Sequence, residues 1–219
     1  SQMLEDAMKA CGIENKHWQR IHNVVDDFFY HPISPLTITP KGGRFRFLHV
    51  SCFDEKAKNV QGMLRAVRKL ANKRQDFELI IVGTGVDHTQ TMAYAEQLQF
   101  PNDMLTFTGE QTPYQVAQWM QQSDCFVLFS NYENAPVVLS ECLATGLPII
   151  SSRAGGIPEM ITETDGILVN TQDEHQLTHA MLWMMEYTSN YPPQHIREHG
   201  CKYSYAAVGK QLVDLYQKV

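Results

Sequence analysis

The sequence lacks the features of a membrane-spanning or nucleic-acid-binding chain. None of its apolar runs approaches the roughly 18 residues that a membrane-spanning helix needs. It has 18 Lys and Arg against 24 Asp and Glu, a net charge of −6, and no basic run. Nucleic acids and anionic membrane faces select basic surfaces, so we expect neither as a partner of this domain.

Cysteine is sparse and odd in number. Five cysteines stand far apart in the sequence, at positions 11, 52, 125, 142 and 201. An odd, widely spaced set predicts reduced thiols instead of a disulfide framework. Reduced thiols are typical of the cytoplasm. We therefore expect a cytoplasmic location, which for a full-length protein includes the inner face of the membrane.

The sequence also lacks a complete metal-binding motif. His175 with His179, and His195 with His199, are each spaced by one helical turn, as metal ligands can be. Neither pair comes with a third ligand or an H-E-x-x-H pattern. We interpret both pairs as solvated helix faces and expect no protein-bound metal.

A dinucleotide-binding fingerprint is begun but not completed. Gly83 and Gly85 in IVGTG let the backbone turn sharply at a strand end and allow a nucleotide to approach closely. A simple strand-to-helix turn explains them as well. The third glycine of G-x-G-x-x-G is missing, which argues against a nicotinamide dehydrogenase.

Short apolar stretches alternate with segments of helical periodicity along most of the chain. Such a βαβ series predicts an α/β fold, a Rossmann-like parallel sheet with helices on both faces, whose ligands bind beyond the carboxyl ends of the strands. Pro32–Gly43 is the one loop-like break in composition. The expected strands cover residues 46–51, 78–82, 104–108, 124–129, 148–152 and 167–169.

The stretch NYENAPVVLSECLATGLP contains a predicted helix start directly after a buried strand. We expect a helix over residues 135–144, with Asn134 as its N-cap and Pro136 in its first turn, where the missing N–H costs nothing. The free N–H groups of Val137 and Val138 and the positive end of the helix dipole then suit a phosphate or diphosphate.

Two glutamates surround this helix start. Glu133 stands in the loop before the helix, and Glu141 about one and a half turns inside it. A carboxylate at the place of Glu141 can accept two hydrogen bonds from a vicinal diol such as a ribose. An ordinary loop carboxylate is the alternative for Glu133, whereas a glutamate near the core is costly unless something hydrogen-bonds it.

Several short motifs follow one another in a recognisable order. Glu133, seven intervening residues and Glu141 lead into LATGLPIISSRAGGIPEMI, and further matches are FLHVSCFDEKAKNVQGMLRAV, ELIIVGTG, LTFTGEQTPYQVAQWMQQSDCFVLFS, DGILVNTQDEHQLTHAM and KYSYAAVGKQLVDLYQKV. Over residues 20–219 this order resembles the nucleotide-sugar half of retaining GT-B glycosyltransferases of glycosyltransferase family 4 (group 1).

The resemblance implies a second domain that is absent from these 219 residues. A GT-B enzyme has two Rossmann-like domains and needs about 350 residues or more. The chain begins at Ser1 without an initiator methionine or a signal peptide, so we expect residues 1–24 to be a remnant of the N-terminal domain and the interdomain crossing. Residues 25–219 are then the nucleotide-sugar-binding domain. We expect residues 18–25 to form a strand that pairs with the other half, and residues 1–30 either to pack less firmly than the rest or to associate with a neighbouring molecule.

The resemblance also implies roles for individual residues. Lys58 matches the family's phosphate-binding lysine, although an exposed lysine at a helix start is the alternative. The family's partner arginine is missing, so either Lys56 supplies the second positive charge or Ser51 and the backbone do. Phe107 lies where the family holds the base through its main chain. The implied catalytic residues are Glu133 and Lys58, and the implied donor-binding residues are Glu141, Asn134, Ala135, Val137, Val138, Ser51, Gly83, Gly85 and Phe107.

The function implied is retaining transfer of a sugar from a nucleoside diphosphate sugar to an acceptor hydroxyl, in glycan or polysaccharide biosynthesis. This chain would supply the donor-binding half and be inactive alone, with the acceptor glycan or lipid-linked sugar bound through the missing N-terminal domain. Family frequency favours a UDP-sugar over a GDP-sugar, and no cofactor is expected. A GT-B-like sugar epimerase or phosphorylase, and a non-catalytic nucleotide-sugar-binding module, remain as alternatives.

Overall fold

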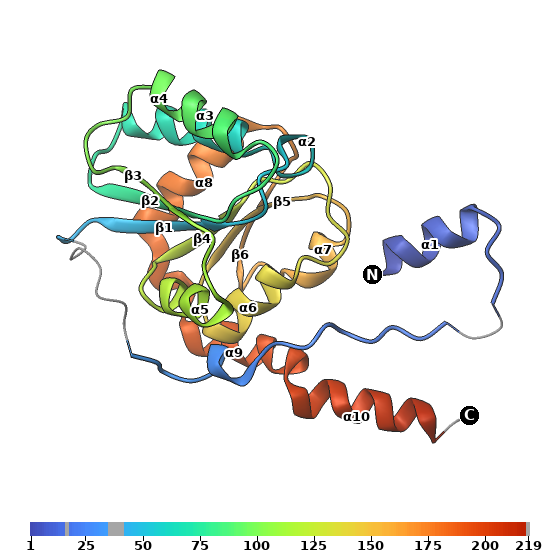
Figure 1. Ribbon diagram of the computed structural model, residues 1–219. Helices are drawn as coiled ribbons and strands as arrows, with labels where there is room; N and C mark the ends of the chain where they lie inside the picture. Colours follow the sequence, from blue (N-terminus) through green and yellow to red (C-terminus); the bar gives the residue numbers. More distant parts are fainter. Residues whose placement is uncertain (16–17, 35–41, 218–219) are drawn as a thin grey trace.

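Six parallel strands form one sheet, in the order β3-β2-β1-β4-β5-β6 (Figure 1). The computed structural model describes residues 1–15, 18–34 and 42–217. Each predicted strand is confirmed to within one residue at either end, and so is the predicted α/β fold class. Most of the Pro32–Gly43 loop lies outside the described residues. The strands are β1 (Phe45–Val50), β2 (Phe77–Val82), β3 (Leu105–Gly109), β4 (Cys125–Leu128), β5 (Ile149–Ser152) and β6 (Gly166–Val169).

Helices cover both faces of the sheet (Figure 1). One face carries α3 (Val60–Ala71), α4 (His88–Gln97) and α8 (Glu174–Tyr187), and the other carries α5 (Pro113–Gln121), α6 (Val137–Thr145) and α9 (Pro193–Gly200). The remaining elements are α1 (Gln2–Ala10), α2 (Glu55–Lys58), α7 (Ile157–Met160), α10 (Tyr205–Tyr216) and the 3-10 helices η1 (Asp27–Phe29), η2 (Thr188–Asn190) and η3 (Cys201–Tyr203). In the described part of the chain, no helix is both long and apolar enough to cross a membrane.

The strands are apolar on both faces because helices bury both faces. Phe47 and Leu48, neighbours on β1, point to opposite sides and join different core clusters. Every residue of β2 is buried, although Glu78 is charged, because the buried Arg46 donates to its carboxylate at 2.6 Å. All five cysteines have free thiols, as the sequence predicts.

The strand order reverses at the centre of the sheet. From β1 the chain continues to β2 and then β3 on one side, and only afterwards returns to place β4 on the other side of β1. Phe47 pairs with Cys125 and Leu48 with Phe126 across this central boundary. The loops that leave β1 and β4 therefore turn toward opposite faces, which opens a crevice between them at the carboxyl edge.

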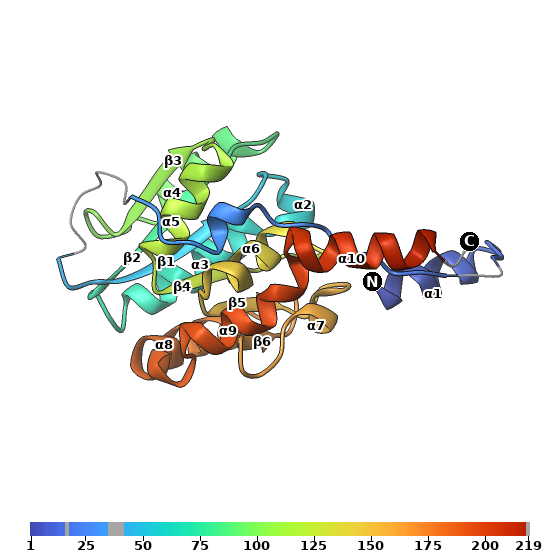
Figure 2. The same ribbon diagram turned by 90° about the horizontal axis from the view of Figure 1, so that it is seen from below.

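The N-terminal segment packs differently along its length. Residues 18–26 form no strand, and within the described chain the Val25 N–H donates instead to the Tyr203 carbonyl at 2.9 Å. Val25 and Phe29 are 1% and 2% exposed and belong to the core, with Phe28 and Tyr30 packed against it, so the apolar side chains of residues 25–30 do not pack loosely. Helix α1, by contrast, buries none of its residues. Figure 2 shows α1 and α10 projecting from the same side of the body.

Phe29 should therefore stabilise the domain although it precedes the first strand. We expect Phe29→Ala to lower the free energy of unfolding by about 3 to 5 kcal/mol, the usual cost of removing a buried aromatic ring. Leu4→Ala on α1, where Leu4 is 42% exposed, is the control and should change it by less than about 0.5 kcal/mol. Urea denaturation measures both, and equal effects would contradict this assignment of residues 25–30 to the core.

Candidate functional site

A cavity of about 350 Å³ opens in the crevice between β1 and β4. Its walls come from the carboxyl ends of these strands and the loops after them, from the end of α2, from the first turn of α5 and from the first two turns of α6. Of the residues predicted from the sequence, the ones that line the cavity are Ser51, Lys58, Glu133, Val137, Val138 and Glu141. The sequence did not single out Gln111, Pro113 and Cys52, which line it as well.

Lys58 and Glu133 form an ion pair in this cavity. Lys58 Nζ lies 2.6 Å from Glu133 Oε1, and the two side chains are 18% and 8% exposed. Ser130 Oγ donates a second hydrogen bond, of 2.7 Å, to the same carboxylate oxygen. Asn131 holds the two loops together, because its N–H donates to the Ala57 carbonyl at 2.7 Å. Glu133 is therefore a fixed, nearly buried carboxylate, not an ordinary loop side chain.

Helix α6 begins two residues later than predicted. Its N-cap is Pro136, whose φ of −65° and extended ψ suit that position, so the prediction of Asn134 as the cap is wrong. Asn134 Oδ1 instead accepts from Ser1 Oγ at 2.8 Å. The N–H groups of Val137 and Val138 donate no hydrogen bond to any described residue. They remain available to an anion at the positive end of the helix.

Asn134 and Ala135 do not line the cavity. Asn134 faces the N-terminal segment, and Ala135 packs against the apolar core beside α6. Their side chains therefore border the site without entering it.

Glu141 points into the cavity from the second turn of α6. No hydrogen bond reaches its carboxylate from the described residues. Burial, and then the nearby charge of Asp26, raises the pKa of Glu141 to about 7. A partly buried carboxylate without a donor is suited to hydroxyl groups of a ligand, because two hydroxyls would satisfy its oxygens.

His49 was not predicted as part of this site. It lies on β1, is fully buried, and places Nε2 2.7 Å from Ser51 Oγ and Nδ1 2.8 Å from the Val127 carbonyl oxygen. Burial is the main cause that lowers the pKa of His49 to about 4. The only sequence signal was a histidine within the otherwise apolar run FLHV.

Gly83 and Gly85 pack against the loop after β1 and do not line the cavity. A Cβ at Gly83 would lie 2.0 Å from the Ser51 carbonyl oxygen, and one at Gly85 would lie 2.4 Å from the Phe53 nitrogen. The close approach that these glycines permit is between two loops of the protein. Phe107 does not line the cavity either, since its ring packs edge-on to Phe53, with the centroids 6.3 Å apart.

The glycines of AGGIPE have a similar packing role next to Glu133. A Cβ at Gly155 would lie 1.7 Å from the Glu133 carbonyl oxygen, and one at Gly156 would lie 2.1 Å from that of Asn134. The loop after β5 thus packs closely against the backbone of Glu133 and Asn134. Glu159 accepts hydrogen bonds from the N–H groups of residues 2 and 3 and does not line the cavity.

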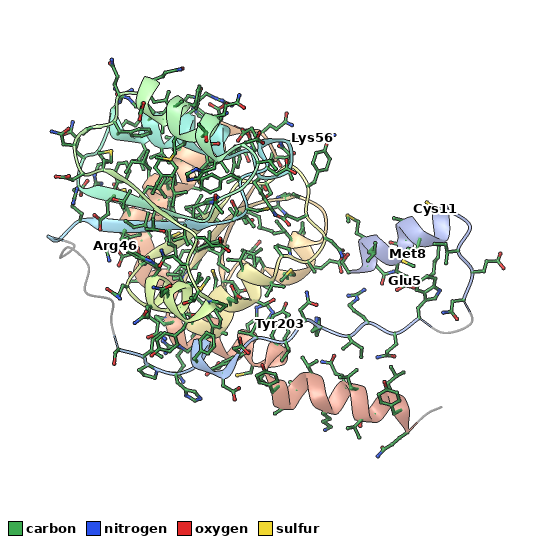
Figure 3. All side chains as sticks on the ribbon, in the orientation of Figure 1. Glu5, Met8, Cys11, Arg46, Lys56 and Tyr203 are labelled. Atoms are coloured by element: carbon green, nitrogen blue, oxygen red, sulfur yellow. The ribbon has the colours of Figure 1, made fainter. Side chains whose placement is uncertain are left out.

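Lys58 is the only cation among the described residues that line the cavity. Ser51, Cys52 and Phe53 stand across the place where the resemblance calls for an arginine, and of these Ser51 and Cys52 line the cavity. Lys56 is exposed and projects from α2 into solvent (Figure 3), so its side chain does not reach this wall.

The two histidine pairs have different surroundings. His175 and His179 lie side by side on α8 with ring centroids 4.3 Å apart and the ring planes tilted by 42°. The prediction of a solvated helix face is wrong for His199. Its Nδ1 lies 2.7 Å from Asp165 Oδ2, and its Nε2 lies 2.6 Å from Lys202 Nζ. In the described part of the chain, no group of three or more His, Cys, Asp or Glu side chains could hold a metal ion.

A larger cavity, of about 600 Å³, lies at the opposite end of the sheet. Its walls include the rings of Phe29, Tyr30 and Tyr191 and the guanidinium of Arg197. Arg197 Nε already donates to the Thr145 carbonyl at 3.0 Å. This cavity lies at the amino ends of the strands and shares no residue with the site, so its size does not make it the stronger candidate.

The fold and the cavity together define a Rossmann-like α/β domain with a ligand site at the carboxyl edge of its sheet. Residues 38–199 match the family model of the glycosyl transferases group 1. This match covers most of the chain, and the chain belongs to that family. Its structural relatives are GT-B glycosyltransferases, so the Rossmann-like domain is a half of that fold.

Relatives of the chain are glycosyltransferases or related synthases. It is 31% identical over 155 residues to N-acetyl-alpha-D-glucosaminyl L-malate synthase of Bacillus anthracis, covering 69% of this chain and 39% of the relative. Sucrose-phosphate synthase of Thermosynechococcus elongatus superposes with a TM-score of 0.85 at 20% identity, over 100% of this chain and 56% of that one. Anabaena Alr3699/HepE in complex with UDP gives 0.85 at 16% identity, over 100% and 62%. The chain thus spans about two fifths of the curated relative.

Glu141 should make the stability of the domain depend on pH. Its pKa is near 4.5 in the unfolded chain and about 7 in the folded one. Below pH 4.5 it is neutral in both states, and above pH 7 the folded state carries the full cost of the buried charge, so stability falls as the pH rises through this window. Glu141→Gln should then raise the free energy of unfolding by roughly 2 to 3 kcal/mol at pH 8, with a gain that vanishes toward pH 4.5.

Chemical denaturation of both proteins at a series of pH values measures this difference. Glu163→Gln is the matched control, because Glu163 is exposed and its replacement should change little at any pH. A gain for Glu141→Gln that stays constant with pH would contradict the assignment of the shifted pKa to Glu141.

Proposed function

We propose that this domain binds the nucleoside diphosphate sugar of a retaining glycosyltransferase of family 4, which transfers the sugar to an acceptor hydroxyl in glycan or polysaccharide biosynthesis. One observation carries the proposal. The free amides of Val137 and Val138, the Lys58 ammonium and the two carboxylates of Glu133 and Glu141 line the same cavity. Donors for a diphosphate thus lie beside acceptors for sugar hydroxyls.

The proposed chemistry is electrostatic stabilisation of the leaving group. The amides at the start of α6 and the Lys58 ammonium would bind the diphosphate and stabilise the charge that develops on it as the glycosidic bond breaks. Glu141 would accept the ribose hydroxyls, and Glu133 hydroxyls of the donor sugar. No side chain here is assigned a proton transfer, and no protein-bound metal or cofactor is required.

Donor binding would change the Lys58–Glu133 ion pair. Lys58 Nζ lies 2.6 Å from Glu133 Oε1, so a diphosphate must compete with this carboxylate for the lysine. When Lys58 turns to the phosphate, Glu133 Oε1 loses one of its two donors and keeps the Ser130 hydroxyl. A sugar hydroxyl would replace the lost donor. The exchange would therefore favour a complete nucleotide-sugar over a bare nucleoside diphosphate.

The whole enzyme would need a second, acceptor-binding domain. Relatives are longer than this chain, and α1 and α10 project from the body with exposed apolar residues such as Met3, Leu4, Val213 and Tyr216. We propose that these helices contact the N-terminal domain, through which the acceptor glycan or lipid-linked sugar binds. UDP is the nucleotide we expect first, by analogy with the UDP-bound structural relative. The free thiols favour a cytoplasmic location.

The first test measures ligand binding by this domain alone. Calorimetric titration with UDP, GDP and ADP should give weak binding that is strongest for UDP, and incubation with UDP-sugars and acceptor glycans should give no transfer product. Absence of binding by all three nucleotides would refute the proposed function. Robust sugar transfer by the isolated domain would refute the need for a second half.

The second test separates the roles of the two glutamates. Glu141→Ala removes the acceptor of two ribose hydroxyls and should weaken UDP binding by about 10- to 100-fold, the range expected for hydrogen bonds to a charged group. Glu133→Ala should weaken the binding of a UDP-sugar but not that of UDP, because its partner is the sugar. Titrations of both variants with both ligands measure the difference. Equal losses for UDP and UDP-sugar in Glu133→Ala would contradict the division of roles.

A further inference from the structure

The proton of the Ser51 hydroxyl can be located from its neighbours. His49 Nδ1 lies 2.8 Å from the Val127 carbonyl oxygen, and a carbonyl oxygen can only accept. Nδ1 therefore carries the ring proton of a neutral imidazole. In that tautomer Nε2 is only an acceptor, so the Ser51 hydroxyl, 2.7 Å away, donates its single hydrogen to Nε2.

The surroundings of His49 keep its ring neutral. The ring is completely buried, and the nearby charged group, Lys58 on α2, is positive and lowers the pKa of His49 further. The Glu133 carboxylate is engaged by Lys58. From β4 the ring meets the Val127 carbonyl, and the Cys125 thiol in the same layer has a raised pKa and is uncharged. The side chains that α3 and β2 pack into this layer are apolar, namely Val60, Met63, Leu64, Val67, Leu79 and Ile81.

We propose that His49 is a positioning residue that fixes Ser51 as a hydrogen-bond acceptor, so that Ser51 binds a hydroxyl of the donor sugar and not the diphosphate. This proposal rests on the proposed function. Ser51 lines the cavity, and its hydroxyl oxygen, which donates its hydrogen to His49, has only lone pairs left for a ligand. Phosphate oxygens are acceptors too, whereas a sugar hydroxyl can donate. Turning the Ser51 hydrogen toward a phosphate would leave the buried Nε2 without a donor, which is unfavourable.

This assignment answers which group replaces the missing arginine. Ser51 has no hydrogen to offer, and Lys56 does not line the cavity. Lys58 and the amides of Val137 and Val138 are then the groups that stabilise the negative charge of a diphosphate. Ser51 instead adds an acceptor to the sugar-binding side of the cavity, together with Glu133.

The position of the proton can be measured directly. Long-range proton–nitrogen NMR spectra of the whole chain distinguish the two tautomers and the imidazolium, from about pH 6 to pH 8, with and without UDP. We expect His49 to be neutral with its proton on Nδ1 throughout. A proton on Nε2 in the free protein, or an imidazolium that forms when UDP is added, would overturn the proposal, because Ser51 would then be able to donate to the diphosphate.

Binding measurements test the consequence for the ligand. Ser51→Ala should weaken the binding of the preferred UDP-sugar, chosen among UDP-glucose, UDP-galactose and UDP-N-acetylglucosamine, by about three- to tenfold and leave UDP binding unchanged. Ser51→Thr keeps the hydroxyl and should retain most of the affinity for the UDP-sugar. His49→Gln should resemble Ser51→Ala in sparing UDP. A loss of UDP affinity in Ser51→Ala equal to the loss for the UDP-sugar would overturn the proposal.

Nucleotide binding by the domain and the role of His49 and Ser51 are tested by separate results. If the wild-type chain binds none of UDP, GDP and ADP, the proposed function is wrong, and the spectrum of the free protein still decides whether Ser51 is an acceptor. If UDP binds and His49 carries its proton on Nε2, the proposed function stands and the role of His49 and Ser51 is wrong.

Discussion

The pairing of β1 with β4 is the constraint on which the site depends. Residues 45–50 and 125–128 are far apart in the sequence, yet their strands are hydrogen-bonded neighbours at the centre of the sheet. Lys58 follows the first of these strands and Glu133 follows the second, so their ion pair spans the boundary at which the strand order reverses. Without this pairing, the helix that presents free amides and the short helix α2 that presents the lysine would not face each other.

The chemistry of the site comes from a few polar groups set in a largely apolar wall. The loop of Glu133 is held by Asn131 from one side and by Gly155 from the other, which leaves its carboxylate little freedom to move. Glu141 is positioned by its helix instead, since it lies within α6, whose other side chains pack into the core. One carboxylate is thus satisfied by protein donors and the other is not. That difference in hydrogen bonding, more than a difference in position, separates their proposed roles.

Much of this arrangement could be predicted from the sequence. Short apolar stretches indicate buried strands, and the order of the motifs indicates the topology of the sheet. The strand positions and the convergence of Ser51, Lys58, Glu133 and Glu141 follow from these two signals. The sequence around a residue does not show, however, which distant residue it will contact in the fold. Residues 18–25 have the composition of a strand, but in this chain Val25 donates to the Tyr203 carbonyl and Arg20 contacts Gln2 and Glu159. The helix cap moved to Pro136 because proline already has the required φ. A histidine within the apolar run FLHV was the only sequence signal for His49, and its partner, the Val127 carbonyl, belongs to another strand and could not be predicted from that signal.

The ion pair also has a consequence for the speed of association. The described wall of the cavity has one cation, Lys58, and Glu133 already neutralises it, while the protein as a whole carries a net charge of −6. An anionic ligand approaching such a surface meets no long-range attraction that could guide it. The net charge of −6 would slow the encounter with the proposed nucleotide ligand at low ionic strength, and salt would speed it modestly by screening that charge. Attraction would arise only at short range, once the ion pair opens, so the lifetime of the complex would determine its affinity.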